Sequence, residues 1–171
     1  IMNLNKNIVL LGMMGSGKST IGFLLSKKIN CSFLDVDKFI EKETNLKIHD
    51  IFQKKGENYF RDIEEKITLK LIKSKGKVIS LGGGGFLNKN IRKEILRNHI
   101  SFWLNWKNST LINRIIKSKK RPIAFNSNEN DLKKLIGERS NIYAEAKFKI
   151  NCETLTKNMI VKNIIRLYEQ N

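Results

Sequence analysis

The sequence has only two cysteines and a single proline among its 171 residues. Cys31 and Cys152 stand apart, without C-x-x-C spacing or nearby histidines, so the pattern predicts neither a disulfide framework nor a cysteine-based metal site. Isolated thiols are typical of a reducing compartment. We therefore expect a cytoplasmic protein in which both cysteines pack as small hydrophobic residues.

Long hydrophobic runs are also absent. No stretch approaches the roughly eighteen apolar residues that a membrane-spanning helix needs. The early apolar run Asn7-Ile8-Val9-Leu10-Leu11 is followed directly by Gly12, which favours a buried strand over a secretory signal. The sequence predicts no membrane partner.

Acidic residues are scarce: 16 Asp and Glu face 33 Lys and Arg, a formal net charge of +17. Such an excess is compatible with binding to nucleic acid. However, the longest basic run is Lys119-Lys120-Arg121, no aromatic residues interleave with it, and the other lysines are scattered among Asn and Ile. We interpret the charge as a solvated surface that attracts small anions, and expect no nucleic-acid partner.

Short apolar runs alternate with longer helical patterns along the whole chain. Strands are expected at 7–11, 32–35, 77–81, 100–104 and 148–151, and helices at 18–29, 36–43, 48–55, 57–74, 88–97, 109–116, 129–146 and 159–168, with Gly56 as a helix stop. Apolar strands that lack polar alternation and are separated by helices predict a parallel sheet covered on both faces. The chain is therefore expected to be an α/β protein.

The segment GMMGSGKS, residues 12–19, matches the phosphate-binding pattern G-x-x-x-x-G-K-[ST] and lies between an expected strand and an expected helix. Glycines allow backbone N–H groups to converge on phosphate oxygens. In this pattern Lys18 reaches the β- and γ-phosphates and Ser19 offers a hydroxyl to Mg²⁺. The guanine-selecting N-K-x-D sequence is absent, so we expect ATP.

Two carboxylates, Asp35 and Asp37, follow the second expected strand, at the sheet edge where α/β folds bind ligands. One of them can serve the metal and the other an acceptor. The alternative for Asp37 is a helix N-cap.

Two further features extend the candidate site. Arg61 lies on an expected helix among Glu57, Glu64 and Glu65, where it either binds a ligand or pairs within the helix. SLGGGGF, residues 80–86, follows the third strand. Its glycines either admit a ligand against the backbone or form a flexible turn.

Taken together, these segments resemble the shikimate kinases. GMMGSGKST, LDVD, the F-R-x-x-E segment from Phe60 to Glu64, SLGGG, Arg121-Pro122 and Arg139-x-x-x-Tyr143 occur in the order and spacing of that family. The resemblance implies one domain, residues 2–171, with three α/β/α layers and a five-stranded parallel sheet of order 2-3-1-4-5. It also implies an acceptor-binding helical segment at about 36–62 and a closing lid at about 117–128.

The activity implied by this resemblance is transfer of the ATP γ-phosphate to the 3-hydroxyl of shikimate. In these kinases the matching residues bind ATP (Gly15, Ser16, Gly17, Lys18, Ser19, Thr20, Arg114 and Arg121), Mg²⁺ (Ser19 and Asp35) and shikimate (Asp37, Arg61, Gly82, Gly83, Gly84 and Arg139). Lys18, Asp37 and Arg121 would be catalytic, Arg114 would stack on adenine, and Arg121 would come from the lid.

The sequence departs from the family pattern at two places: Gly85 extends the glycine run, and Asn151-Cys152-Glu153-Thr154 lacks a basic residue near adenine. Two other functions remain open, a kinase for another hydroxy acid such as gluconate and a nucleic-acid-dependent ATPase. Nothing in the pattern demands more than a monomer.

Overall fold

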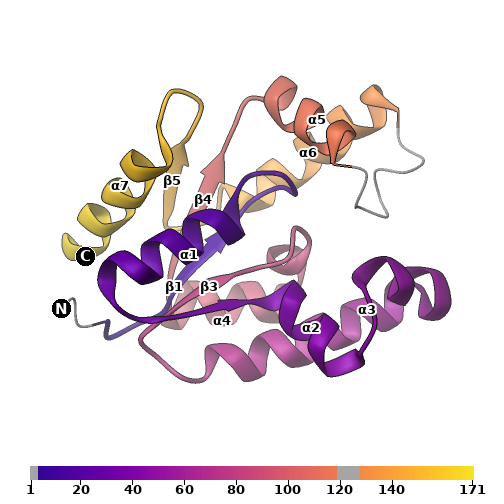
Figure 1. Cartoon of the computed structure of the whole chain (residues 1–171), viewed down its shortest axis with the longest axis horizontal. Coiled ribbons are helices and arrows are strands. Elements are labelled where there is room, and N and C mark those ends of the chain that lie inside the picture. Colours follow the sequence, from indigo (N-terminus) through magenta and orange to yellow (C-terminus); the bar gives the residue numbers. More distant parts are fainter. Residues whose placement is uncertain (1–3, 119–127) are drawn as a thin grey trace.

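A five-stranded parallel sheet forms the centre of the molecule, as seen in a computed structural model that describes residues 4–118 and 128–171 (Figure 1). The strands are β1 (Ile8–Leu11), β2 (Ser32–Asp35), β3 (Lys77–Ser80), β4 (Ile100–Asn105) and β5 (Phe148–Asn151). They lie in the order β2-β3-β1-β4-β5, and all neighbouring pairs run parallel. The predicted fold class and strand order are confirmed.

Helices cover both faces of this sheet. They are α1 (Lys18–Ile29), α2 (Val36–Thr44), α3 (Ile48–Ile72), α4 (Lys89–Asn98), α5 (Asn108–Lys117), α6 (Glu129–Tyr143) and α7 (Lys157–Glu169), with a short 3₁₀ helix η1 (Gly85–Leu87). Among the described residues, no helix is both long and apolar enough to cross a membrane.

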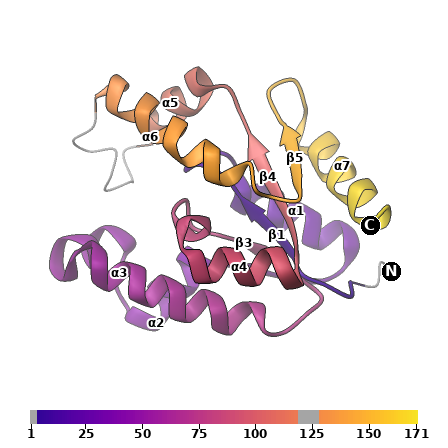
Figure 2. The ribbon, with the colours of Figure 1, turned by 180° about the vertical axis from the view of Figure 1, so that it is seen from behind.

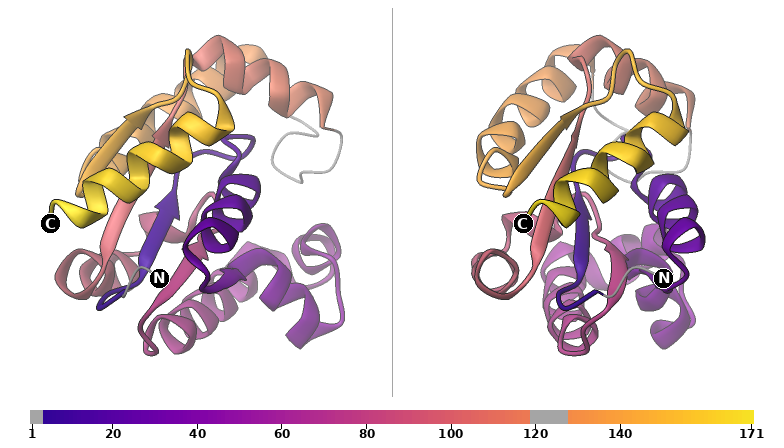
Figure 3. Two further views of the ribbon diagram at one scale, coloured as in Figure 1. Left: turned by 60° about the vertical axis from the view of Figure 1, so that its left-hand side comes forward. Right: turned by 90° about the vertical axis from the view of Figure 1, so that its left-hand side faces the viewer.

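Alternation along β1 divides the core in two, because successive strand residues point to opposite faces. Ile8 and Leu10 pack with α1 and α7, whereas Val9 and Leu11 pack with α3, α4 and α6. Figure 2 shows the face covered by α3, α4 and α6, and Figure 3 shows the sheet between the two helical layers. The central strands β1 and β4 are buried on both faces, which is why they are largely apolar, whereas the edge strands β2 and β5 include exposed polar residues.

Gly56 interrupts α3, as the sequence predicts. Its backbone angles, φ 84° and ψ 168°, are non-helical and belong to a region that is essentially restricted to glycine. The chain therefore turns between two helical pieces.

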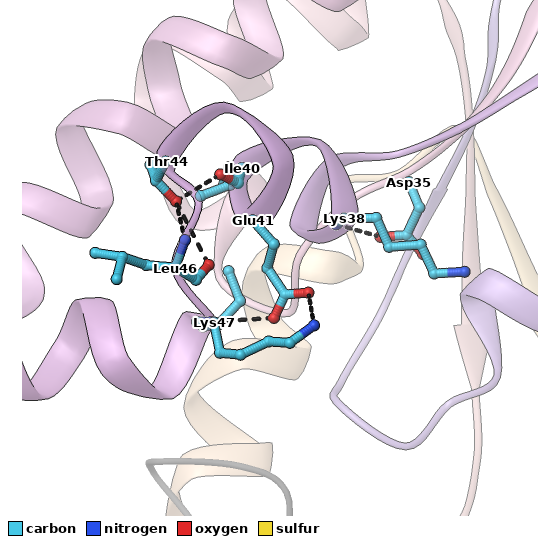
Figure 4. A network of polar contacts seen from close by, with 8 residues as sticks. Asp35, Lys38, Ile40, Glu41, Thr44, Leu46 and Lys47 are labelled. Carbon is cyan, nitrogen blue, oxygen red and sulfur yellow. Dashed lines mark hydrogen bonds and ion pairs between the residues drawn. The ribbon is translucent and has the colours of Figure 1, made fainter.

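The junction between α2 and α3 is held by polar contacts (Figure 4). The Thr44 hydroxyl donates to the Ile40 carbonyl at 2.8 Å. The Glu41 carboxylate accepts from Lys47 Nζ at 3.2 Å and from the Ile48 backbone N–H at 3.1 Å. Since Ile48 is the first residue of α3, Glu41 satisfies an N–H that the helix itself leaves unpaired.

The loops at the carboxyl ends of the strands meet at one edge of the sheet. The loops after β1 and β3 lie between α2–α3 on one side and α5–α6 on the other (Figure 1). Asp35 is in register with Ser80, and Leu10 pairs with the same serine from the other side. The sheet thus brings the P-loop (residues 12–19), the end of β2 and the glycine run together.

Candidate active site

The P-loop has the backbone that its glycines predict. Gly12, Gly15 and Gly17 have φ values of 139°, 78° and 87°, a region that disfavours side chains. Gly12 also packs closely, since a Cβ there would lie 2.9 Å from the Leu104 carbonyl oxygen. The loop is therefore a tightly wound turn at the start of α1.

Lys18 folds back over this turn. Its Nζ donates to the Gly12 carbonyl at 2.8 Å and to the Met13 carbonyl at 3.0 Å, and the side chain is buried. A pocket of about 220 Å³ opens beside it, lined by Gly15, Gly17, Lys18, Ser19, Thr20, Asp35, Asp37, Ser80, Leu81 and Gly83. Predicted ATP, metal and acceptor residues thus share one pocket.

The two carboxylates after β2 have different environments. Asp35 caps α2, because its Oδ1 accepts from the Lys38 backbone N–H at 3.3 Å (Figure 4), and its Oδ2 accepts from the Ser19 hydroxyl. The alternative reading of Asp37 as the N-cap is therefore wrong. Asp37 lies in the first turn of α2, where it lines the pocket.

The glycine run lies where side chains would collide with charged groups. A Cβ on Gly82 would be 2.6 Å from Asp37 Oδ1 and 2.7 Å from Glu64 Oε1, and one on Gly84 would overlap the Arg61 guanidinium. Gly85 is different, because a Cβ there would make only ordinary contacts. A side chain at position 82 or 84 would therefore displace the charged ends of Asp37, Glu64 or Arg61 from their present positions.

Arg61 pairs within its helix, as the alternative in the sequence suggests. Its Nη1 donates to Glu64 Oε2 at 2.6 Å and its Nη2 to Glu57 Oε1 at 3.1 Å, whereas Glu65 instead accepts from Asn88 and Asn90. The guanidinium also lies against Gly84. Helical pairing and a position at the site therefore coexist.

Glu64 is the most deeply buried carboxylate in the described part of this site. Burial raises the pKa of its carboxyl group, and the neighbouring Asp37 adds to this, while Arg61 and Arg139 oppose it. Its Oε1 has no hydrogen-bond partner among the described residues. Sequence reasoning missed this environment, although the three-residue spacing from Arg61 was a signal.

Arg139 and Tyr143 lie one turn apart on α6. Arg139 is buried, its Nη1 lies 3.5 Å from the position of a Cβ on Gly83, and its Nε has no hydrogen-bond partner in the described chain. The Tyr143 hydroxyl donates to the Gly83 carbonyl, and burial raises the pKa of Tyr143 to about 12. Tyr143 is thus a neutral donor that attaches the glycine run to α6.

Arg114 lies at the opposite side of the P-loop. Its Nη1 donates to the Gly15 carbonyl at 3.2 Å, and its Cζ lies 3.9 Å from the centroid of the Trp106 ring. Trp106, which the motifs did not single out, donates from Nε1 to the Ser16 carbonyl at 2.9 Å.

The segment 151–154, where the sequence departs from the family, is tied to the start of α5. Glu153 accepts from the Lys107 backbone N–H at 3.2 Å and from the Thr110 hydroxyl at 2.7 Å. These contacts lower the pKa of Glu153. Arg121 and Pro122, in the predicted lid, lie outside the described residues.

The arrangement suits chemistry on phosphate. A wound turn of backbone N–H groups at a helix N-terminus attracts anions, and Lys18, Arg61, Arg114 and Arg139 supply cations around it. Oxygen ligands of the kind that Mg²⁺ prefers, the Ser19 hydroxyl and the Asp35 carboxylate, are already adjacent. Phosphoryl transfer requires such positioning and charge stabilisation.

Comparisons with known proteins agree with this geometry. The family model for shikimate kinase matches residues 14–169. The chain is 40% identical to a shikimate kinase of Sulfurihydrogenibium over 94% of this chain and 96% of that protein, and 41% identical to one of Persephonella marina over 94% and 97%.

Solved structures show the same relationship. A shikimate kinase from Acinetobacter baumannii, in complex with shikimate, superimposes with a TM-score of 0.92 at 30% identity, covering 97% of this chain and 94% of that one. The resemblance seen in the motifs is therefore confirmed, and the chain belongs to the shikimate kinase family.

Proposed function

We propose that this protein transfers the γ-phosphoryl group of ATP to the 3-hydroxyl of shikimate, giving shikimate 3-phosphate and ADP. The observation that carries the proposal is the shared pocket, in which Lys18 of the P-loop faces the same space as Asp37. The relative from Acinetobacter baumannii, whose structure contains shikimate, supports the choice of acceptor.

The donor side uses the P-loop. Backbone N–H groups of Gly15 to Thr20 and the ammonium of Lys18 bind the phosphates, and Arg114 binds the adenine end. Ser19 and Asp35 would hold Mg²⁺, which neutralises phosphate charge when it is bound. The Asp35 carboxylate is positioned for this role, because its Oδ1 caps α2 and its Oδ2 accepts a hydrogen bond from Ser19, the other proposed ligand.

The acceptor side uses Asp37, Arg61 and Arg139 around the glycine run. A guanidinium presents N–H groups in a planar fork that matches a carboxylate, so the two arginines bind the acid group of shikimate. Gly82, Gly83 and Gly84 admit the ring against the backbone. Asp37 then lies beside the hydroxyl groups.

The transfer itself is mainly a matter of alignment. The acceptor oxygen attacks the γ-phosphorus in line, the bond to the β,γ-bridging oxygen breaks, and the hydroxyl proton passes to Asp37. Lys18 stabilises charge on the phosphoryl oxygens during transfer. Arg121 joins from the lid at 117–128, which excludes water and limits hydrolysis of ATP.

An ADP-release assay with alternative acceptors tests the proposal. We expect turnover with shikimate, much less with quinate or gluconate, and no stimulation by RNA. Absence of shikimate-dependent ADP release would refute the assignment. Turnover with gluconate would favour the related hydroxy-acid kinase, and stimulation by RNA would favour the nucleic-acid-dependent ATPase.

Location and assembly complete the proposal. Cys31 and Cys152 are both free thiols, which suits a reducing cytoplasm. All proposed ligand contacts come from one chain, so a monomer suffices. Light scattering of the purified protein with ATP and shikimate would reveal any larger assembly.

A further inference from the structure

We propose that Trp106 is a positioning residue for the nucleotide, because it orients the P-loop backbone and supports Arg114. This inference rests on one part of the proposed function, namely that the P-loop binds the phosphate groups of ATP. It is independent of the acceptor. Trp106 lies between β4 and α5, 90 residues from the carbonyl that it binds.

Two consecutive P-loop carbonyls accept hydrogen bonds from Trp106 and from Arg114 of α5. Trp106 Nε1 donates to Ser16 O at 2.9 Å, and Arg114 Nη1 donates to Gly15 O at 3.2 Å. Ser16 lies between Gly15 and Gly17, both with positive φ. Since glycine imposes little restriction on the backbone, the peptide planes here depend on external contacts for their orientation.

Holding a carbonyl also directs the neighbouring N–H. The described chain contains no cis peptide bond, and in a trans peptide the C=O and N–H point in opposite directions. The bond from Trp106 to Ser16 O therefore turns the Gly17 N–H away from the indole. Gly17 lines the pocket, so this N–H is available to phosphate oxygens.

The indole ring also fixes Arg114. The guanidinium carbon lies 3.9 Å from the ring centroid, a separation at which a cation is attracted to an aromatic face. One ring face and one carbonyl thus hold a side chain that otherwise has many rotamers. Glu153 in turn fixes the start of α5, directly after Trp106, through Lys107 N–H and Thr110.

The alternative is that Trp106 is only a packing residue. It is partly buried and touches both halves of the hydrophobic core, so its replacement can lower stability without any specific effect on ligands. Packing and positioning differ in which ligand is affected. A packing role changes unfolding or affects all ligands alike, whereas a positioning role weakens polyphosphate binding alone.

Trp106→Phe separates these roles, since it keeps an aromatic ring and removes the N–H donor. We expect the dissociation constants of magnesium tripolyphosphate and magnesium ATP, measured by calorimetry, to rise about tenfold, ~1.4 kcal/mol. The KM for shikimate should stay within about twofold of the wild-type value. Tripolyphosphate lacks the adenine base of ATP. Weaker binding of tripolyphosphate therefore reports a change in the P-loop backbone rather than a lost contact to adenine.

Tyr168→Phe is the matched control. It removes another side-chain hydrogen bond to a backbone carbonyl, from Tyr168 to Lys6 at 3.1 Å, near the opposite end of β1. It should leave binding of both polyphosphates unchanged. The thermal unfolding midpoints of both variants establish that each is folded.

Wild-type affinity of Trp106→Phe for tripolyphosphate and ATP would overturn the inference, and so would an equal loss of shikimate binding. The proposed function fails in a different way. Suppose that the wild type binds tripolyphosphate and that Trp106→Phe weakens this binding, but that the wild type shows no shikimate-dependent ADP release. The assignment of shikimate as the acceptor would then be wrong, while the role of Trp106 in polyphosphate binding would remain supported.

Discussion

At the scale of single residues, Lys18 illustrates how the site prepares for an anion. Its ammonium is buried and bonded to two carbonyls of its own loop, which keeps a buried cation solvated by backbone dipoles. The same group can exchange these carbonyls for phosphate oxygens. The fold therefore maintains the charge where phosphates are expected.

Lys18→Ala should lower kcat with shikimate and ATP by about 10²–10³-fold, the typical effect of removing one electrostatic contact to a transition state. The fold should persist, because Lys18 belongs to neither half of the hydrophobic core. The ADP-release assay measures the loss, and circular dichroism checks folding. Wild-type turnover by the folded variant would exclude a role for Lys18 in transfer.

Arg139 tests the acceptor side. Its buried Nε lacks a hydrogen-bond partner among the described residues, and a buried polar group of this kind is costly unless a ligand satisfies it. Arg139→Ala should raise the KM for shikimate by about 10- to 10²-fold, since a charge-assisted contact contributes ~1.5–3 kcal/mol, and should leave the KM for ATP nearly unchanged. An unaltered KM for shikimate would identify Arg139 as a structural residue.

At the scale of elements, several helix bounds could be predicted closely from the sequence, whereas others could not. Helices at 18–29, 36–43 and 109–116 agree with α1, α2 and α5 to within a residue at each end, because apolar periodicity and caps are local signals. The expected helix 129–146 instead ends at Tyr143. The 3₁₀ turn η1 was not predicted, since four glycines carry no periodicity.

Gly56 and Gly137 form a matched pair at this scale. A Cβ would meet nothing within 4 Å at either position, but Gly56 has φ 84° while Gly137 lies within α6. Gly56→Ala should lower the free energy of unfolding by about 1–3 kcal/mol through backbone strain, and Gly137→Ala should raise it by about 1 kcal/mol. Urea titration measures both changes. Equal effects of the two substitutions would show that the kink is not strained for alanine.

At the scale of the whole molecule, the sheet order brings distant segments to one edge. β1 lies between β3 and β4, so the P-loop lies between the glycine run on one side and the Trp106–Arg114 pair on the other. Lys18, the predicted ATP-binding residue, and Asp37, the predicted acceptor-binding residue, consequently line the same pocket. The sheet order also concentrates most buried charges at a single end of the fold.

Acid stability is a property of the whole chain to which His99 contributes. Both of its ring nitrogens are buried without hydrogen-bond partners in the described residues. Burial lowers the pKa of His99, Lys75 and Lys6 add to this effect, and Glu94 opposes it. The unfolded chain therefore binds this proton more readily than the folded one, and folding stability falls as pH drops below about 6.5.

Glu64 acts in the opposite direction, because its raised pKa contributes stability at low pH that is lost as pH rises above about 4.5. Since Glu64 and His99 change stability with pH in opposite directions, a substitution must separate their two effects. The free energy of unfolding of the wild type minus that of His99→Gln should decrease as pH falls from about 7 to 5, because glutamine does not titrate. Urea unfolding at several pH values measures the difference, and a constant difference between the two proteins would contradict the assignment to His99.

The sequence by itself determined the five strands, the P-loop and the kink at Gly56, because each depends on residues that are neighbours in the chain. Only the tertiary structure decided how deeply Glu64 is buried beside Asp37 and Arg139, and that Trp106 holds the Ser16 carbonyl. These contacts join segments up to 90 residues apart. Their proximity follows from the order of the strands and the packing of the helices, which no local pattern encodes.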